Sequence, residues 1–409
     1  MTDTGPIVVV GGGHAGAQLC SGLAQAGLGP RVHLVCEEGY LPYQRPPLSK
    51  AYLKNPDELL QEHRTSDWFS DHAITVHRED VVSSIDRSAK KVKLGSGAVL
   101  PYAQLVLATG TRARQLHGIP SGLKNVAVVR TAHDAARMRG LLADAGHVTV
   151  LGGGFIGLEV AATARSLGKT VTVLEAAPRL LSRSVSPELA EHVLRTHRAN
   201  GIDMRMGVSA GHFEVVGDRL DALTVDGVRE TVELLVLGVG AVPETSLAEA
   251  AGLECGNGVV VDACMRTSDP AILAIGDCTS FPTHPLAQHA GGRLRLESVQ
   301  NANDQAHTAT ATLLGREEPY RALPWFWSEQ GSMRLQMVGL APADGERHRR
   351  PGPNDQSFSI LHYVGRELRC VESVNAPVDH MMARKLLQAG RSPEPELACN
   401  PTSPLKSFL

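Results

Sequence analysis

What the chain lacks excludes several classes of protein. Aromatic residues make up only 4% of its 409 residues, too few for the stacking platforms that bind single-stranded nucleic acid. The formal net charge of −3 gives no basic surplus with which to neutralise phosphates. No apolar run approaches the roughly 20 residues of a membrane-spanning helix. The opening stretch MTDTGPIVVVGGG has no basic region followed by an apolar one, so no signal peptide is expected. We therefore expect no nucleic-acid partner and no membrane partner.

Cysteine is sparse and scattered. The seven cysteines occupy positions 20, 36, 255, 264, 278, 370 and 399, and no two of them form a C-x-x-C motif. This usage indicates a reducing cytoplasm, without structural disulfides or a thiolate metal site. Cys36 is expected to pack in the core. Histidines such as His284, His289 and His307 lack metal-ligand spacing backed by a carboxylate, so no metal is expected.

An internal repeat is the most informative feature that is present. The stretch IVVVGGGHAGAQLCSGLAQAGLGPRVHLVCEE, from Ile7, recurs from Val148 as VTVLGGGFIGLEVAATARSLGKTVTVLEAA. Each copy reads as a buried strand, a glycine turn, a helix with apolar residues at helical spacing, and a second strand that ends in an acid. This is the β-α-β unit of a parallel sheet. Two copies predict two dinucleotide-binding domains.

The glycines of the first copy have the spacing that a bound dinucleotide requires. Gly11, Gly13 and Gly16 match G-x-G-x-x-G. In this motif the first glycine makes a tight turn, the second lets the backbone approach a pyrophosphate, and the third allows close packing of helix on strand. The phosphate then lies at the helix N-terminus. Glu37, at the end of the second strand, is placed to accept hydrogen bonds from a ribose.

The second copy repeats the set with Gly152, Gly154, Gly157 and Glu175. A carboxylate at Glu175 pairs with a free 2′-hydroxyl and repels a 2′-phosphate, which favours NADH over NADPH. Arg179 and Arg183 lie just downstream. Their charges either soften that preference or belong to a solvated helix start.

The rest of the chain completes three predicted domains. AQLVLATGTRA is a strand that leaves the first domain near Gly110, and AILAIGDCTSFP is a strand that ends at Gly276 and Asp277. A helix is expected at SVQNANDQAHTATATLLG. After YRALPWFWSEQG, alternating strands and one helix predict an α+β domain, in which ERHRRPGPND is expected to be a charged loop. The predicted fold is α/β, with a discontinuous FAD-binding domain at 1–112 and 245–320, an NAD-binding domain at 113–244, and a C-terminal α+β domain at 321–409.

The two glycine motifs, the Ala-Thr-Gly exit and AILAIGDC together resemble the FAD-dependent pyridine nucleotide reductases of the glutathione-reductase fold. Disulfide reductases and peroxidases of that superfamily carry redox cysteines after the first glycine motif. Here no cysteine lies between Glu37 and Tyr102. That region instead contains PYQRPPLSK, which, with GGGFIGLEVA, LESVQNANDQA and PWFWSEQ, resembles the oxygenase-coupled, putidaredoxin-reductase-like ferredoxin reductases.

The resemblance implies which residues hold the cofactors, FAD in the first copy and NAD(H) in the second. It brings Asp277 to the ribitol and phosphate side of FAD, Arg45 to the FAD phosphates, and Lys50 and Trp327 near the flavin ring. It also implies that the N–H groups of Val299 and Gln300 face the flavin C2=O. The expected cofactor-binding residues are Gly11, Gly13, His14, Ala15, Gly16, Glu37, Arg45, Lys50, Ala108, Thr109, Gly110, Gly152, Gly154, Phe155, Ile156, Gly157, Glu159, Glu175, Arg183, Gly240, Gly276, Asp277, Ser298, Val299, Gln300 and Trp327.

Lys50 and Glu159 are the residues expected to take part in catalysis. The sequence puts Glu159 in the first turn of the second helix, where a carboxylate also stabilises the helix N-terminus. By resemblance this glutamate lies near the nicotinamide. We expect a Lys50–Glu159 pair that opens when the nicotinamide stacks on the flavin.

The predicted activity is reduction of a [2Fe–2S] ferredoxin by NADH. A hydride is expected to pass to flavin N5, and the electrons then to leave singly for a ferredoxin that supplies a cytochrome P450 or another oxygenase. Arg293 and Arg295 are candidates for a ferredoxin-docking patch. The alternatives are a rubredoxin or monodehydroascorbate reductase, or a signalling flavoprotein related to apoptosis-inducing factor. A monomer or weak dimer is expected.

Overall fold

The chain folds into two compact units, each assembled from segments that are separated in the sequence. The computed structural model describes residues 4–283 and 292–409. The first unit contains residues 1–44, 60–112 and 242–325, and the second contains residues 45–59, 113–241 and 326–409. The boundaries predicted for three domains stay a prediction.

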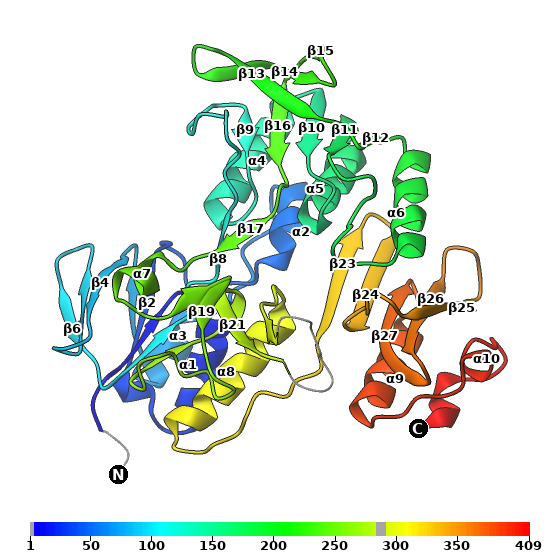
Figure 1. Cartoon of the computed structure of the whole chain (residues 1–409). Helices are drawn as coiled ribbons and strands as arrows, with labels where there is room; N and C mark the ends of the chain where they lie inside the picture. Colours follow the sequence, from blue (N-terminus) through cyan, green and yellow to red (C-terminus); the bar gives the residue numbers. More distant parts are fainter. Residues whose placement is uncertain (1–3, 284–291) are drawn as a thin grey trace. The chain divides into compact units, whose positions relative to one another are not determined.

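The first unit is built on a five-stranded parallel sheet. Its strands, in spatial order, are β20 (Ile272–Ala274), β7 (Gln104–Leu107), β1 (Ile7–Val10), β2 (Val32–Cys36) and β3 (Thr75–Arg78). All four residues of β1 are buried, because a central strand of a parallel sheet is covered on both faces. Two helices, α1 (His14–Gln25) and α8 (Val299–Leu313), pack against each other (Figure 1).

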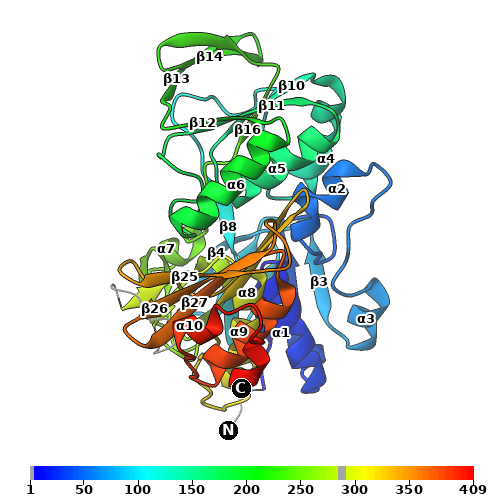
Figure 2. The same cartoon turned by 90° about the vertical axis from the view of Figure 1, so that its right-hand side faces the viewer.

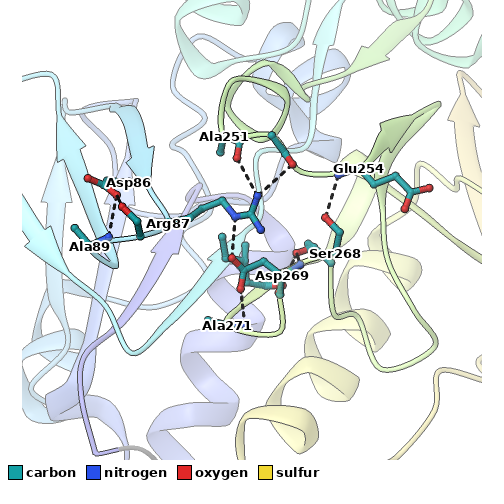
Figure 3. Close-up of polar contacts among 12 residues, drawn as sticks. Asp86, Arg87, Ala89, Ala251, Glu254, Ser268, Asp269 and Ala271 are labelled. Carbon is teal, nitrogen blue, oxygen red and sulfur yellow. Dashed lines mark hydrogen bonds and ion pairs between the residues drawn. The ribbon is translucent and has the colours of Figure 1, made fainter.

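Smaller antiparallel or mixed sheets complete the first unit. One contains β4 (Val82–Asp86), β5 (Lys91–Leu94) and β6 (Val99–Pro101), and the other β18 (Cys255–Gly256), β19 (Gly258–Val260), β21 (Thr279–Pro282) and β22 (Arg293–Leu294). Arg87, directly after β4, links the first of these sheets to residues 251–269 of the same unit (Figure 3). Its guanidinium lies 2.8 Å from Asp269 and donates to the carbonyls of Ala251 and Gly252. The short helices of this unit are α3 (Ser66–Asp71) and α7 (Ser246–Ala250).

The second unit contains a second five-stranded parallel sheet. Its order is β12 (Asp203–Met206), β11 (Thr170–Glu175), β10 (His147–Leu151), β16 (Leu234–Leu237) and β9 (Val126–Ala127). Its helices are α2 (Ala51–Lys54), α4 (Ala132–Asp144), α5 (Phe155–Ser166) and α6 (Pro187–Ala199). A three-stranded antiparallel sheet of β13 (Ala210–Val216), β14 (Arg219–Val225) and β15 (Val228–Thr231) is inserted before β16. The two predicted β-α-β units are therefore confirmed.

The C-terminal sheet also belongs to the second unit. Its order is β23 (Trp325–Gln330), β24 (Met333–Gly339), β27 (Glu367–Val374), β26 (Phe358–Val364) and β25 (Glu346–Pro351). It is followed by α9 (Pro377–Gln388), which packs on β24 and β27, and by α10 (Pro395–Ala398) (Figure 2). Phe358 and Val374 share one hydrophobic cluster with Val150 and Leu158 of the parallel sheet and its helix. Chain segments at β8 (Thr111–Ala113) and β17 (Ala241–Pro243) lead from one unit to the other.

One secondary-structure prediction was wrong. The stretch ERHRRPGPND, expected to be a charged loop, begins with the edge strand β25, which pairs antiparallel with β26. Arg350 of this strand is buried, forms an ion pair with Asp379 and donates to the carbonyls of Ala398 and Asn400. Charged residues are tolerated here because an edge strand turns one side to solvent. No helix within the described residues is long and apolar enough to cross a membrane.

Candidate functional site

The first glycine turn has the geometry of a phosphate cradle. Gly11 has φ +114°, and a Cβ built on it would lie 2.3 Å from the Ala108 carbonyl oxygen. A Cβ on Gly16 would lie 2.1 Å from the Gly11 oxygen, so helix and turn are in contact. At Gly13, by contrast, no described atom lies within 4 Å of the Cβ position. The three glycines thus make the turn, hold the packing and leave backbone open for a ligand.

The second turn reproduces this geometry. A Cβ on Gly152, whose φ is +106°, would lie 2.5 Å from the Gly238 oxygen, and one on Gly157 would lie 2.4 Å from the Gly152 oxygen. At Gly154 the nearest described atom is the Gly238 oxygen, 3.7 Å away. Both helices start at a glycine N-cap that has no side-chain cap, and neither has an acid in its first turn. Their N–H groups therefore suit an anion, and both turns fit a dinucleotide pyrophosphate.

The acids at the ends of the second strands differ in their surroundings. Glu175 lies at the end of β11, and its carboxylate accepts from the Gly153 N–H at 2.6 Å and the Ala177 N–H at 2.7 Å. Glu37 follows β2 directly and is exposed. The carboxylate of the second copy is consequently fixed against its own glycine turn. That of the first copy lies at the surface.

Several other residues expected around FAD lie within the first unit, whereas Arg45, Lys50 and Trp327 lie in the second. Gly276 has φ +82°, and a Cβ on it would lie 3.0 Å from the Ala15 Cβ, so Asp277 sits beside the start of α1. Gln305 of α8 accepts from the Gly276 N–H at 2.7 Å. Ser298 caps α8 by accepting from the Asn301 N–H at 3.0 Å, which confirms the predicted helix start.

A cavity of about 220 Å³ opens beside these elements. His14 of α1 and Val299 of α8, both expected to contact the cofactor, line it together with Gln44, His63 and Asn303. The rings of His14 and His63 meet edge to face, with centroids 4.6 Å apart. The first unit therefore combines a phosphate cradle with an adjoining polar cavity.

Residues 45–59, which contain most of the stretch PYQRPPLSK, belong to the second unit. Arg45 donates to the Arg130 carbonyl at 2.7 Å, and the Ser49 carbonyl accepts from the Thr163 hydroxyl at 2.8 Å. Arg139 of α4 stacks on the Tyr52 ring at 4.2 Å, and Leu53 is part of the hydrophobic cluster of the second unit. Arg45 and Lys50 are thus held on the unit that contains the second glycine turn.

Lys50 and Glu159 form the expected pair. The Lys50 Nζ lies 2.7 Å from Glu159 Oε2, which also accepts from the Ser49 hydroxyl at 2.6 Å. The other oxygen, Oε1, accepts from the Ser328 hydroxyl of β23 at 2.7 Å. The Glu159 side chain is 3% exposed and the Lys50 side chain 20% exposed. One carboxylate therefore gathers three donors in a nearly dry environment.

The expected position of Glu159 in its helix was wrong. Helix α5 begins at Phe155, so Glu159 is its fifth residue and lies beyond the first turn. A carboxylate there is too far along the helix to stabilise the open N–H groups at its start. Its partners come instead from the 3₁₀ helix Pro46–Ser49, from Lys50 and from β23.

Known proteins resemble the chain along its whole length. A family model described as pyridine nucleotide-disulphide oxidoreductase matches residues 5–306, and one described as reductase C-terminal matches residues 325–409. The chain belongs to the pyridine nucleotide-disulphide oxidoreductase family. Rhodocoxin reductase of Rhodococcus erythropolis is 41% identical over 403 residues, which are 98% of this chain and 93% of that protein.

Two solved structures are also similar. The ferredoxin reductase for the CYP199A2 system from Rhodopseudomonas palustris superposes with a TM-score of 0.92 at 42% identity, covering 98% of this chain and 99% of that one. The reductase in the covalent putidaredoxin reductase–putidaredoxin complex also has a TM-score of 0.92, at 36% identity, covering 99% of this chain and 98% of that one. As a pyridine nucleotide-disulphide oxidoreductase, the chain is an oxidoreductase that uses FAD and a pyridine nucleotide.

The family is named for disulphide chemistry, but this oxidoreductase has no disulfide among its described residues. All seven cysteines are free, and the stretch between Glu37 and Tyr102 contains none. Cys36 is buried, as predicted, and burial raises the pKa of its thiol to about 12. A thiol with that pKa is a poor nucleophile at neutral pH. Within the described residues, no cluster of three or more His, Cys, Asp or Glu could hold a metal, and His284 and His289 lie outside those residues.

The remaining predicted residues of this oxidoreductase lie in the second unit. Ile156 is 49% exposed, and the Phe155 ring packs on Phe326 with centroids 4.6 Å apart. The Arg183 guanidinium lies 3.7 Å from the Cβ position of Gly240. Trp327 is half-buried in β23.

Three arginines have partners within their own units. Arg179 donates to the carbonyls of Val185 and Ser182. Arg293 donates to the carbonyls of Val261 and Ser280, and the Arg295 side chain is 13% exposed and paired with Glu297 at 2.6 Å. Arg293 and Arg295 are consequently less suited to a docking patch than their sequence positions indicate.

Sequence reasoning missed the serines that surround Glu159. Ser49 and Ser328 lie inside PYQRPPLSK and PWFWSEQ, the two stretches that were singled out for their arginine, lysine and tryptophans. Their hydroxyls meet Glu159 from positions 110 and 169 residues away in the chain. Only the tertiary fold of the second unit reveals that contact.

Proposed function

We propose that this oxidoreductase passes electrons from NADH through FAD to a [2Fe–2S] ferredoxin that supplies a cytochrome P450 or another oxygenase. The observation that carries the proposal is the end-to-end similarity to reductases named for such carriers. Rhodocoxin reductase matches 98% of this chain, and the reductase bound to putidaredoxin matches 99%. FAD, when bound, accepts two electrons at once from a nicotinamide and releases them singly.

The absence of cysteine between Glu37 and Tyr102 supports this direction of electron flow. A disulfide reductase needs a pair of redox cysteines after its first glycine motif. In the corresponding part of this chain, PYQRPPLSK carries Ser49 and Lys50 and no cysteine. The seven free cysteines also support a cytoplasmic location. We propose that the electrons leave for a separate protein and not for a disulfide of the chain itself.

We propose that the two glycine turns divide the cofactors, FAD at Gly13 and NADH at Gly154. In the three-domain arrangement that we favour, residues 1–112 and 245–320 bind FAD, residues 113–244 bind NADH, and residues 321–409 form the third domain. Asp277, the open N-terminus of α1 and the capped start of α8 supply the polar groups for FAD. Their role is to hold and orient the cofactor and to stabilise the charge that develops on it.

NADH is the nucleotide that Glu175 favours. Hydrogen bonds from Gly153 and Ala177 fix its carboxylate, so this negative charge cannot easily turn away from a 2′-phosphate. Arg179 is engaged with carbonyls of its own loop, which leaves it poorly placed to offset that charge. Arg183 is the one downstream arginine that we retain as a possible contact to the nucleotide.

Lys50 and Glu159 form the proposed gate for the nicotinamide. The pair is closed at 2.7 Å, and the Lys50 ammonium also donates to the Pro46 carbonyl at 3.0 Å. Entry of the nicotinamide is proposed to move the ammonium away from Glu159. Both residues then lie next to the reacting ring and orient it.

Anaerobic stopped-flow spectroscopy tests this proposal. The FAD-loaded protein is mixed with NADH or NADPH and then with an oxidised [2Fe–2S] ferredoxin, rubredoxin or monodehydroascorbate. We expect faster bleaching of the flavin by NADH than by NADPH, rapid reduction of a [2Fe–2S] protein, and no inhibition by arsenite, which blocks dithiols. A stable reduced complex that transfers electrons to none of the carriers would overturn the proposal in favour of a signalling flavoprotein.

A further inference from the structure

A chain of hydrogen bonds leads from the Glu159 carboxylate into the interior of the second unit. The Ser328 hydroxyl contacts Glu159 Oε1 at 2.7 Å, and Gln330 Nε2 lies 3.2 Å from the Ser328 oxygen. Gln330 Oε1 in turn lies 2.8 Å from His197 Nε2. Glu159, Ser328, Gln330 and His197 are all buried, with side chains or residues at most 3% exposed. The chain joins α5 to α6 through two alternate residues of β23.

The chemistry of the donors fixes the direction of this chain. Burial lowers the pKa of His197, which leaves a neutral ring with a single N–H. That proton is on Nε2, since the only acceptor offered there is the Gln330 oxygen, and Nδ1 has no partner among the described residues. The Gln330 amide then presents its NH₂ to Ser328. The Ser328 hydroxyl is left with its proton pointing at Glu159.

Ser49 supplies a second hydroxyl to the same carboxylate. It contacts Oε2 at 2.6 Å, the oxygen that also binds the Lys50 ammonium. The Ser49 carbonyl is held by Thr163 of α5 at 2.8 Å, so its hydroxyl is fixed independently of Lys50. Glu159 therefore has one cationic partner that is partly exposed and two neutral partners that are buried.

We propose that Ser328 and Ser49 are positioning residues that allow the Lys50–Glu159 pair to open, an inference that rests on the function proposed above. A buried carboxylate that loses its only cation is strongly destabilised unless other donors hydrogen-bond it. The two serines stay in place when Lys50 moves, because Thr163 holds the Ser49 carbonyl and Gln330 holds the Ser328 oxygen. They keep Glu159 satisfied in the open state and lower the cost of admitting a nicotinamide.

Ligand binding to the oxidised, FAD-loaded protein tests this role without turnover. Calorimetric titration compares ADP-ribose, which has no nicotinamide, with tetrahydro-NAD, whose saturated ring cannot transfer a hydride. Only the second ligand requires the pair to open. We expect Ser328→Ala to weaken binding of tetrahydro-NAD by about tenfold while leaving that of ADP-ribose unchanged, because the open state loses a hydrogen bond to a buried charged group. Ser49→Ala should act in the same direction.

Two controls separate this role from a general packing effect. Ser373 is an equally buried serine in β27 of the same sheet, hydrogen-bonded to Ser359 at 3.0 Å, and Ser373→Ala should leave the ratio of the two affinities unchanged. In a Glu159→Gln background the side chain carries no charge that needs a hydrogen-bond donor. Ser328→Ala should then no longer weaken tetrahydro-NAD binding more than ADP-ribose binding.

The outcomes distinguish the inference from the function on which it rests. Equal weakening of both ligands by Ser328→Ala, or the same selective loss in the Glu159→Gln background, overturns the role of the serines alone. If Lys50→Ala and Glu159→Gln also leave the ratio of affinities unchanged, the nicotinamide does not enter at this pair. In that case the proposed gate fails together with the inference.

Discussion

Replacing Gly154 with alanine should impair nucleotide binding without affecting stability, whereas replacing Gly157 with alanine should destabilise the fold. Gly154 has φ −82° and ψ 174°, a conformation that alanine adopts without strain, and its new Cβ would meet only the Gly238 oxygen at 3.7 Å. At Gly157 the Cβ would lie 2.4 Å from the Gly152 oxygen and 3.3 Å from the Val150 Cγ1. The first change fills the space left for a phosphate. The second forces helix α5 away from its own glycine turn.

The expected magnitudes follow from these distances. Gly154→Ala should leave the free energy of unfolding within about 0.5 kcal/mol of wild type, as surface changes usually do. The methyl group keeps the pyrophosphate from the helix N-terminus, and loss of one charge-assisted hydrogen bond, about 1.5–3 kcal/mol, weakens NAD⁺ binding by about 10- to 100-fold. Gly157→Ala should destabilise the second unit by about 1–3 kcal/mol through overpacking.

Three measurements check this contrast. Thermal unfolding reports stability, the flavin absorbance per protein reports FAD content, and calorimetric titration with NAD⁺ reports the nucleotide site. Gly154→Ala should lose NAD⁺ affinity and keep both flavin and stability. Gly13→Ala is the matched control, which should lose FAD from a folded protein. If Gly154→Ala bound NAD⁺ as well as the wild type does, the second turn would not hold the pyrophosphate.

Two further predictions concern charge. Glu175→Ala should shift the ratio of kcat/KM for NADPH over NADH upward by about tenfold, because a repulsion of about 1–2 kcal/mol between the carboxylate and a 2′-phosphate is removed; steady-state kinetics with both nucleotides measure it, and an unchanged ratio would contradict the role of Glu175. Burial, reinforced by the cations Arg384 and Arg334, lowers the pKa of His380 to about 4. The unfolded chain therefore binds a proton that the folded chain excludes as the pH falls from about 6.5 to about 4, and stability should drop in that window by about 2 kcal/mol at pH 5. Urea unfolding at about pH 6.5 and about pH 4 should show a lower free energy of unfolding of the second unit at the lower pH. His380→Gln should make this difference smaller, and an unchanged difference in that variant would refute the prediction.

The glycine turns were predictable from the sequence because their determinants are local. Gly152, Gly154 and Gly157 lie within six residues, and both the positive φ of Gly152 and the contact of Gly157 with the Gly152 oxygen arise inside this stretch. The same holds for the start of α8, where the Ser298 hydroxyl accepts from the N–H of Asn301, only three residues further along the chain. Local chemistry of this kind is visible without a fold.

Long-range contacts were not predictable in the same way. Strand β25 reads as a charged loop because its register is decided by β26 and by the burial of Arg350 against α9 and the C-terminal segment. The two serines around Glu159 come from two stretches that lie far from it in the chain, and no spacing rule connects them. The placement of Lys50 beside Glu159 was anticipated from family resemblance, and it rests physically on Leu53 and Arg139, which no motif identified.

The segment 45–59 has a consequence for how the chain is synthesised. It belongs to the second unit although the residues on both sides of it, 1–44 and 60–112, belong to the first. The first unit cannot be completed until residue 325 has been made, and the second not until its C-terminal sheet has been made. No single truncation yields either unit alone. Both units therefore have to mature late in translation, and a ribosome that stalls after residue 112 exposes Leu53 without the core that would bury it.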